Sequence, residues 1–158
     1  MFSQQVGGAR AGGSPAVVGQ IGPRVRAVAE IHQARHDGAL AAAAATAIGI
    51  PPQVAAALTV VATQRTSHAR ALATEIARAA GKLVSATSET SSSSPSPTDP
   101  AAPPPAVSDV IDSLRTSAGE ASRLVATTSG YRAGLLASIA ASCTASYTVA
   151  LVPSGPSI

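Results

Sequence analysis

Apolar side chains recur every three to four positions in four stretches of the chain, which is the period of an amphipathic helix. The first helix begins near Pro23 and ends at Gly49, because proline favours the first helical turn and glycine the end of a helix. The second helix follows the break GIPP at residues 49–52 and ends near Gly81. Its large apolar residues share one face: Val54, Leu58, Val61, Leu72 and Ile76. The short break predicts that these helices form an antiparallel hairpin.

A second pair of helices follows a long polar segment. Residues 85–106 are rich in Ser and Pro and lack large apolar side chains, so they predict a disordered linker. The third helix begins near Ser108 and carries Asp109 in its first turn, where the helix dipole favours a carboxylate. Its apolar face contains Val110, Ile111, Leu114, Ala118, Ala121 and Leu124 or Val125. A turn at Ser129-Gly130 leads into the last helix, residues 131–152.

These elements predict an all-α fold, a ferritin-like four-helix bundle in which the long linker joins two helical hairpins. Residues 85–106 can extend to about 70 Å, so the linker can run the length of the bundle and the third helix can start at either end. The predicted divisions are a disordered segment 1–22, a first hairpin 23–84, the linker 85–106, a second hairpin 107–152 and a disordered tail 153–158.

Composition and charge narrow the classes of function. Alanine dominates the apolar residues, with one Phe, two Tyr and no Trp, and alanine is the strongest helix former. Residues 1–84 hold eight basic and three acidic groups, residues 85–158 hold three and five, and together they give the net charge of +3. We interpret this as two halves whose opposite charges favour docking. A nucleic-acid partner is not predicted, because the chain lacks a dense basic stripe and stacking aromatic residues.

The sequence carries no combination of residues typical of an enzyme. Cys143 is the only cysteine, so neither an intramolecular disulfide nor a cysteine metal cluster can form, and we expect it to be a buried small hydrophobe. The serines lie in the linker or punctuate helices, and no glycine-rich phosphate loop follows a strand. We therefore expect no catalytic residues, no cofactor and no enzymatic activity.

The chain resembles a group of small, alanine-rich, ferritin-like helical proteins of high-GC actinobacteria, most of them uncharacterised. The resemblance lies in QRTSHARALATEIARAAG (64–81) and SGYRAGLLASIAASCTASYTVAL (129–151), and covers roughly residues 24–84 and 108–151. It implies the fold and no defined activity. Members often carry an export or lipoprotein signal, whereas residues 1–22 show no signal-like apolar run and no cysteine for a lipid anchor. We expect a cytoplasmic location for the chain as it stands, and an exported or cell-envelope location if the true N-terminus is missing.

A ferritin-type di-iron centre is not predicted. Such a centre needs a Glu-x-x-His pair on each of two helices. In this chain the residues three positions after Glu30, Glu75 and Glu120 are Gln33, Arg78 and Arg123.

The three histidines are the remaining candidate site. His32 and His36 lie one helical turn apart, and a hairpin turn about residue 50 places His68 level with His32. Three imidazoles suffice for a zinc or copper site with an open position. The alternative is a solvated face formed by His32, Arg35, His36 and Asp37, which we prefer, or partly buried histidines held by hydrogen bonds.

Two apolar stripes on the first helix separate these alternatives. A stripe of Val25, Val28, Ala29, Leu40 and Ala43 would turn His32 and His36 toward the core. A stripe of Ile31, Ala34, Gly38, Ala41 and Ala45 would turn them outward. The many alanines leave both stripes open.

The sequence of the last helix allows two interpretations. Residues 133–158 carry no charge, and AGLLASIAASCTASYTVALV is long enough to cross a bilayer. Its large apolar residues are few, so we prefer a helix buried in the bundle to a membrane anchor through residues 133–152. The sequence predicts a structural or interaction module with an unknown protein partner or self-association. The alternative is a metal- or small-ligand-binding bundle using His32, His36 and His68.

Overall fold

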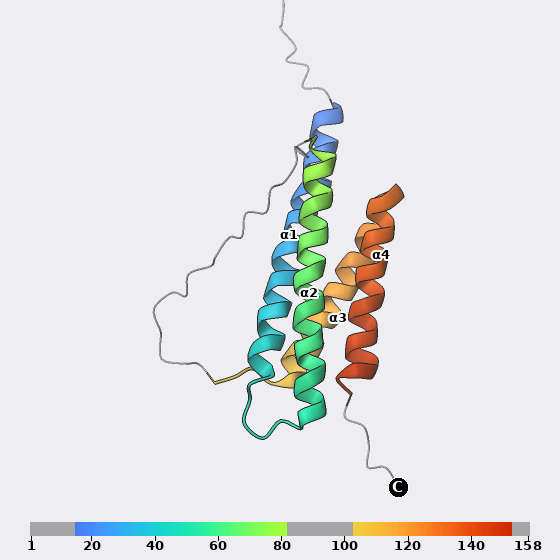
Figure 1. The fold of residues 1–158 in the computed structure, drawn as a ribbon. Helices are drawn as coiled ribbons and strands as arrows, with labels where there is room; N and C mark the ends of the chain where they lie inside the picture. The colour runs from blue at the N-terminus through green and yellow to red at the C-terminus, as the bar shows by residue number, and fades with distance from the viewer. Residues whose placement is uncertain (1–14, 82–102, 153–158) are drawn as a thin grey trace, which may run out of the picture.

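The structure is a computed structural model that describes residues 15–81 and 103–152. The described residues form the helices α1 (Pro15–Ala44), α2 (Pro52–Ala79), α3 (Val107–Val125) and α4 (Gly130–Ala145), and a π-helical turn, η1 (Ser146–Ala150). The predicted all-α fold is confirmed, with no strand among these residues (Figure 1). Most of the predicted disordered segments fall on residues 1–14, 82–102 and 153–158, which lie outside the described part.

The helices form two hairpins, α1–α2 and α3–α4, which pack together mainly through α1 and α3 (Figure 1). Four pairs of facing residues fix the directions: Gln33 with Ser113 and Glu30 with Glu120 between α1 and α3, and Gln64 with Ser142 and Glu75 with Arg132 between α2 and α4. In both cases the residue number rises on one helix as it falls on the other, so these neighbours are antiparallel. It follows that α2 and α3 are parallel and that residues 81 and 103 lie toward opposite ends of the bundle.

The N-terminal end of α1 differs from the sequence-based prediction. The helix begins at Pro15 and not at Pro23, so residues 15–22, predicted to be disordered, are helical. Either proline could supply the fixed φ that the first helical turn favours; the structure places Pro15 there and Pro23 inside the helix. Proline correctly indicated the start of a helix, but the sequence did not show which of the two prolines begins it.

The C-terminal end of α1 also lies earlier than predicted, at Ala44. Thr46 Oγ1 donates a hydrogen bond to the Ala43 carbonyl at 2.8 Å, and the backbone tightens into turns that link residues three apart. A threonine hydroxyl competes in this way with the regular helical hydrogen bonds. Gly49 then takes a φ of 82°, which glycine adopts without steric cost, and the chain turns into α2.

The start of α3 lies next to the predicted Ser108, and the Asp109 carboxylate caps it. The helix begins at Val107, and the Asp109 Oδ2 atom accepts a hydrogen bond from the Ala106 amide at 3.0 Å. A carboxylate in this position satisfies a free amide and interacts favourably with the helix dipole.

The last predicted helix is regular only as far as Ala145. In η1 the Leu151 amide donates to the Ser146 carbonyl at 3.0 Å, five residues back, and the Leu151 side chain is buried. The wider turn thus ends the helix with an apolar contact to the core.

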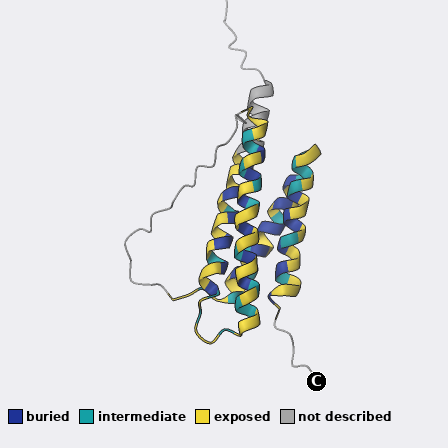
Figure 2. Ribbon diagram, viewed as in Figure 1, coloured by how far each residue is buried: buried dark blue, intermediate teal, exposed yellow. Residues whose placement is uncertain are grey.

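The core confirms the predicted apolar faces of α2 and α3 and identifies the inward stripe of α1 (Figure 2). Ile31, Ala34, Gly38 and Ala41 are buried, whereas Val25 and Val28 are exposed. His32 and His36 therefore point outward. The core side chains of α1 are almost all alanine, so α1 and α2 must approach closely to exclude water.

Gly38 lies at a close approach of α1 and α2. A Cβ atom added there would lie 3.4 Å from the Ala62 carbonyl oxygen and 3.5 Å from Arg65 Cβ, which are ordinary contact distances. A methyl group therefore fits at this position, and a larger side chain does not.

We expect Gly38→Ala to raise the free energy of unfolding by about 0.5–1 kcal/mol, because alanine favours the helix over glycine by roughly that amount. Gly38→Leu is expected to destabilise the bundle, because its branched side chain has no room against α2. Urea unfolding of both variants and the wild type measures the two effects. Destabilisation by the alanine variant would contradict the spacing described here.

Candidate functional site

An ion pair is buried in the core of the bundle. Asp37 of α1 and Arg65 of α2 are both almost completely inaccessible, and Arg65 Nη2 lies 2.7 Å from Asp37 Oδ2. The two residues lie equally far on either side of residue 51, so the α1–α2 hairpin brings them to one level. The sequence-based interpretation placed Asp37 on the solvated face with its neighbours, and for Asp37 this is wrong. The arginine on the facing helix compensates its buried charge.

Three side chains donate hydrogen bonds to the Asp37 carboxylate, and a fourth forms an ion pair with it. Ser113 and Ser117 of α3 donate to Oδ1 and Oδ2 at 2.5 and 2.6 Å, and Gln33 Nε2 donates to Oδ1 at 2.9 Å. Arg65 adds the ion pair at Oδ2. A buried carboxylate is tolerated when its charge is paired and its lone pairs are bonded. Because protein donors occupy its acceptor positions, Asp37 is not free to act as a general base.

Arg65 extends these contacts to the second hairpin. Its Nη2 atom also donates to Ser117 Oγ at 3.1 Å, and Nη1 donates to Cys143 Sγ of α4 at 3.2 Å. Cys143 is buried, as predicted, and burial raises the pKa of its thiol. We name these side chains the Asp37–Arg65 network: Gln33, Asp37, Arg65, Ser113, Ser117 and Cys143. The network joins all four helices.

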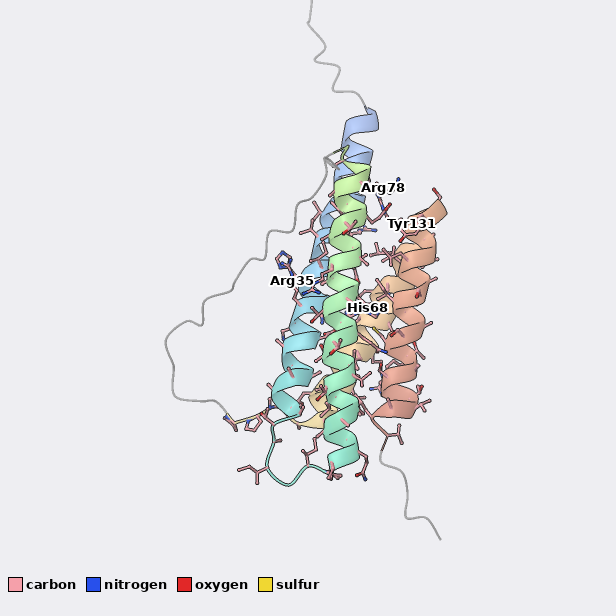
Figure 3. All side chains as sticks on the ribbon, viewed as in Figure 1. Arg35, His68, Arg78 and Tyr131 are labelled. Carbon is pink, nitrogen blue, oxygen red and sulfur yellow. The ribbon has the colours of Figure 1, made fainter. Side chains whose placement is uncertain are left out.

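His68 lies beside this network. Its Nδ1 atom is 3.2 Å from Arg65 Nη1, and Figure 3 shows it on the side of α2 that faces α4. A guanidinium group has only donors, so Nδ1 is the acceptor and carries no proton. Burial, and next the Arg65 charge, lower the pKa of His68 to about 4. His68 is therefore neutral at physiological pH and fixed in one tautomer.

The structure does not bring the three histidines together. His32 and His36 are exposed on α1, and His36 Nδ1 lies 3.9 Å from Asp37 Oδ1 with its side chain mostly in solvent. His68 faces α4, so the level predicted for it does not bring it near the other two. Within residues 15–81 and 103–152 no group of three or more His, Cys, Asp or Glu side chains could hold a metal ion. Zinc or copper uptake by these histidines stays a prediction, for which this arrangement gives no support.

Glu30 is a second buried carboxylate, and its surroundings differ from those of Asp37. Only 2% of the residue is exposed, and its Oε2 atom has no hydrogen-bond partner among the described residues. Burial is the main cause that raises the pKa of Glu30 to about 7, and the negative charges of Glu120 and Asp37 act in the same direction. The Arg65 charge opposes them.

Glu30 lines an open pocket between α1 and α3, which we name the Glu30 pocket. Its volume is about 340 Å³, and its lining residues are Arg26, Ala29, Glu30, Glu120, Arg123 and Leu124. Arg26, Glu120 and Arg123 are exposed, whereas Glu30 is buried. The buried carboxylate thus forms the floor of the pocket, and the other charged groups stand around it.

A third polar cluster links α2 to the N-terminal end of α4. Glu75 accepts two hydrogen bonds from Arg78, at 2.7 and 2.8 Å, and its Oε1 atom lies 3.7 Å from Arg132 Nε. Figure 3 shows Arg78 close to Tyr131 in this region. The hydrogen bonds from Arg78 lower the pKa of Glu75. This cluster holds α4 against α2 but leaves no free carboxylate.

Comparison of the chain with models of protein families, with curated proteins and with solved structures finds no match. The resemblance to ferritin-like actinobacterial proteins therefore stays a prediction. The assignment of a function depends on the geometry of the side chains alone.

The raised pKa of Glu30 predicts how the free energy of unfolding depends on pH. The folded chain binds this proton more tightly than the unfolded chain, so its contribution to stability is lost as the pH rises from about 4.5 to about 7. We expect Glu30→Gln to change the free energy of unfolding little at pH 4 and to raise it by about 3 kcal/mol at pH 8. Urea unfolding across this range measures the difference.

Glu75→Gln is the matched control, because it replaces a buried carboxylate that already has an arginine partner. It is expected to destabilise the fold at pH 8, where the ion pair is intact. A wild-type protein whose stability relative to Glu30→Gln does not depend on pH would contradict the assignment of Glu30.

Proposed function

We propose that this chain is a non-enzymatic interaction module, a four-helix bundle of ferritin-like topology that associates with a second copy through α4. The parallel arrangement of α2 and α3 supports the topology, because one long connection between two antiparallel hairpins is characteristic of ferritin-like bundles. Two features of the site support a non-enzymatic role: protein partners saturate Asp37, and burial of the Cys143 thiol raises its pKa.

One observation carries this proposal. The helical segment from Gly130 to Ala150 is the most apolar of the described helices, and only 22% of its most apolar part is buried. Arg132 is its one charged residue. The sequence-based preference for a helix enclosed by the bundle therefore holds for one side of α4 only. The other side is an uncharged surface.

The residues on this surface are small. Gly134, Ala137, Ala141, Ala145 and Thr148 are all exposed, and they recur at three- to four-residue intervals along one side. Small side chains allow two helices to approach closely, whereas a lipid interface favours large apolar and aromatic residues. This composition suits a helical partner better than a membrane surface.

The absence of charge on this face of α4 further narrows the kind of partner that it can bind. A charged partner surface would lose its hydration against this face without gaining a counter-charge. A second copy presents the same uncharged face, and two-fold symmetry brings that face onto itself. The exposed Val60 and Val149 border an adjoining apolar groove between α2 and η1, which extends the surface.

The membrane alternative requires α4 to leave the bundle. By length and composition the segment Gly130–Ala150 could cross a bilayer. Leu136 and Ile139 would then lose their core contacts, and Cys143 would lose its hydrogen bond from Arg65. For this reason we place self-association first and retain the membrane anchor as the second candidate.

We expect the full-length chain to form dimers in a concentration-dependent manner, measured by size-exclusion chromatography with light scattering. Ala141→Arg is expected to weaken dimerisation at least tenfold, because it places a charge in the centre of the uncharged face. Ala42→Arg, at an exposed alanine of α1, is the matched control and should leave dimerisation unchanged.

A wild-type chain that stays monomeric at millimolar concentration would contradict self-association. Flotation of the wild-type chain with anionic liposomes, lost in Ala141→Arg, would favour the membrane alternative instead.

A further inference from the structure

The Glu30 pocket has the features of a binding site that neither the fold nor self-association through α4 requires. It lies between α1 and α3, whereas the proposed dimer surface lies on α4. Its volume of about 340 Å³ is at the lower end of the range of small-molecule sites, ~300–1,000 Å³. A ligand in it would therefore be small.

The floor of the pocket carries an unsatisfied polar group. Glu30 Oε2 is buried and has no hydrogen-bond partner among the described residues. A buried polar atom without a partner costs free energy, and native proteins satisfy nearly all such atoms. Asp37, on the same helix, accepts three hydrogen bonds and forms an ion pair, so the chain is able to saturate a buried carboxylate. Glu30 lacks these donors and is available to an external one.

The walls of the pocket carry both signs of charge. Arg26 and Arg123 contribute two guanidinium groups, and Glu120 contributes a second carboxylate. None of these side chains takes part in the ion pairs formed by the described residues, although each arginine lies within a turn of a glutamate on its own helix. Ala29 and Leu124 supply apolar contact between the charged groups.

We propose that the Glu30 pocket binds a small zwitterion, a compound with one ammonium and one carboxylate group. The ammonium group donates to Glu30 at the floor of the pocket, with Glu120 as the second counter-charge. The carboxylate accepts from Arg26 and Arg123 at the mouth, where guanidinium groups suit planar carboxylates.

Ligands of a single charge fit this lining less well. A metal cation would find two carboxylates and two arginines, and the arginines oppose its charge. A simple anion would meet Glu30 and Glu120. Two acids and two bases sum to zero when Glu30 is ionised, which matches the net charge of a zwitterion.

Binding should also depend on pH. Five charged groups surround Glu30: Asp37 on α1, Arg65 on α2, Glu120 and Arg123 on α3, and Arg26 at the mouth. The free pocket holds Glu30 partly protonated near pH 7, and an ammonium ligand favours the ionised form. We therefore expect affinity about tenfold higher at pH 8 than at pH 6, where only a small part of Glu30 is ionised.

Isothermal titration calorimetry and amide chemical-shift titration of the full chain test this proposal. The probes are glycine, 4-aminobutyrate, butylamine, butyrate and calcium chloride, each at pH 6 and pH 8. We expect one of the two zwitterions to bind with shifts on α1 and α3, and to bind at least tenfold more tightly than butylamine, butyrate or calcium.

Two pairs of variants test the roles of the side chains. Glu30→Gln is a neutral isostere that is expected to keep the fold, to weaken zwitterion binding and to remove its dependence on pH. Arg123→Gln should weaken binding of the zwitterion but not of butylamine. Arg115→Gln, which changes an arginine of α3 outside the pocket, and Glu75→Gln are the matched controls.

Three results would overturn the proposal. Equal affinity for butylamine would show that the arginines do not take part. Preferred binding of calcium would show a cation site. No binding by any probe at millimolar concentration would show that the pocket holds only water.

Discussion

A buried ion pair between Asp37 and Arg65 links, through its hydrogen-bond partners, the two helical hairpins in the core of the bundle. Removing two charges from water is costly, and the cost is offset only when each partner is bonded by its surroundings. Asp37 alone has partners on three helices, and Arg65 reaches the fourth through Cys143. One pair of residues, together with its hydrogen-bond partners, thus contacts all four helices.

This constraint matters because the apolar core is weakly specific. Alanine dominates the inward face of α1, and small uniform side chains pack almost equally well after a shift along the helix axis. A charged pair with fixed donors does not tolerate such a shift. We infer that the Asp37–Arg65 network sets the register of the bundle, and that the alanines allow the helices to approach closely enough for it to form. Glu30 lies about two helical turns before Asp37 on α1 and is a buried carboxylate that lacks these donors.

Much of the fold was accessible from the sequence, because helical period, proline and glycine are local signals. The faces of α2 and α3 followed from their large apolar residues, and the level of each residue followed from the position of the hairpin turn. The direction in which α1 faces did not follow, because alanines lie on both of its sides. Because of this ambiguity the sequence did not identify the Asp37–Arg65 network. Asp37 lies between His36 and Gly38 in a polar stretch, and Ser113 and Ser117 resemble ordinary serines of a helix surface. The charge of Arg65 gave no sign of its partner until the two helices were placed together.

A double-mutant cycle tests whether the Asp37–Arg65 pair holds the four helices in register. The measurement is the free energy of urea unfolding for Asp37→Asn, Arg65→Met and the double variant. Each single change leaves one buried charge without its partner, so the account predicts losses of about 3–5 kcal/mol, and complete unfolding of a single variant counts as the same result. The double variant should lose clearly less than the sum of the two. Strictly additive losses, or single losses below about 0.5 kcal/mol, the usual range of surface substitutions, would contradict the account.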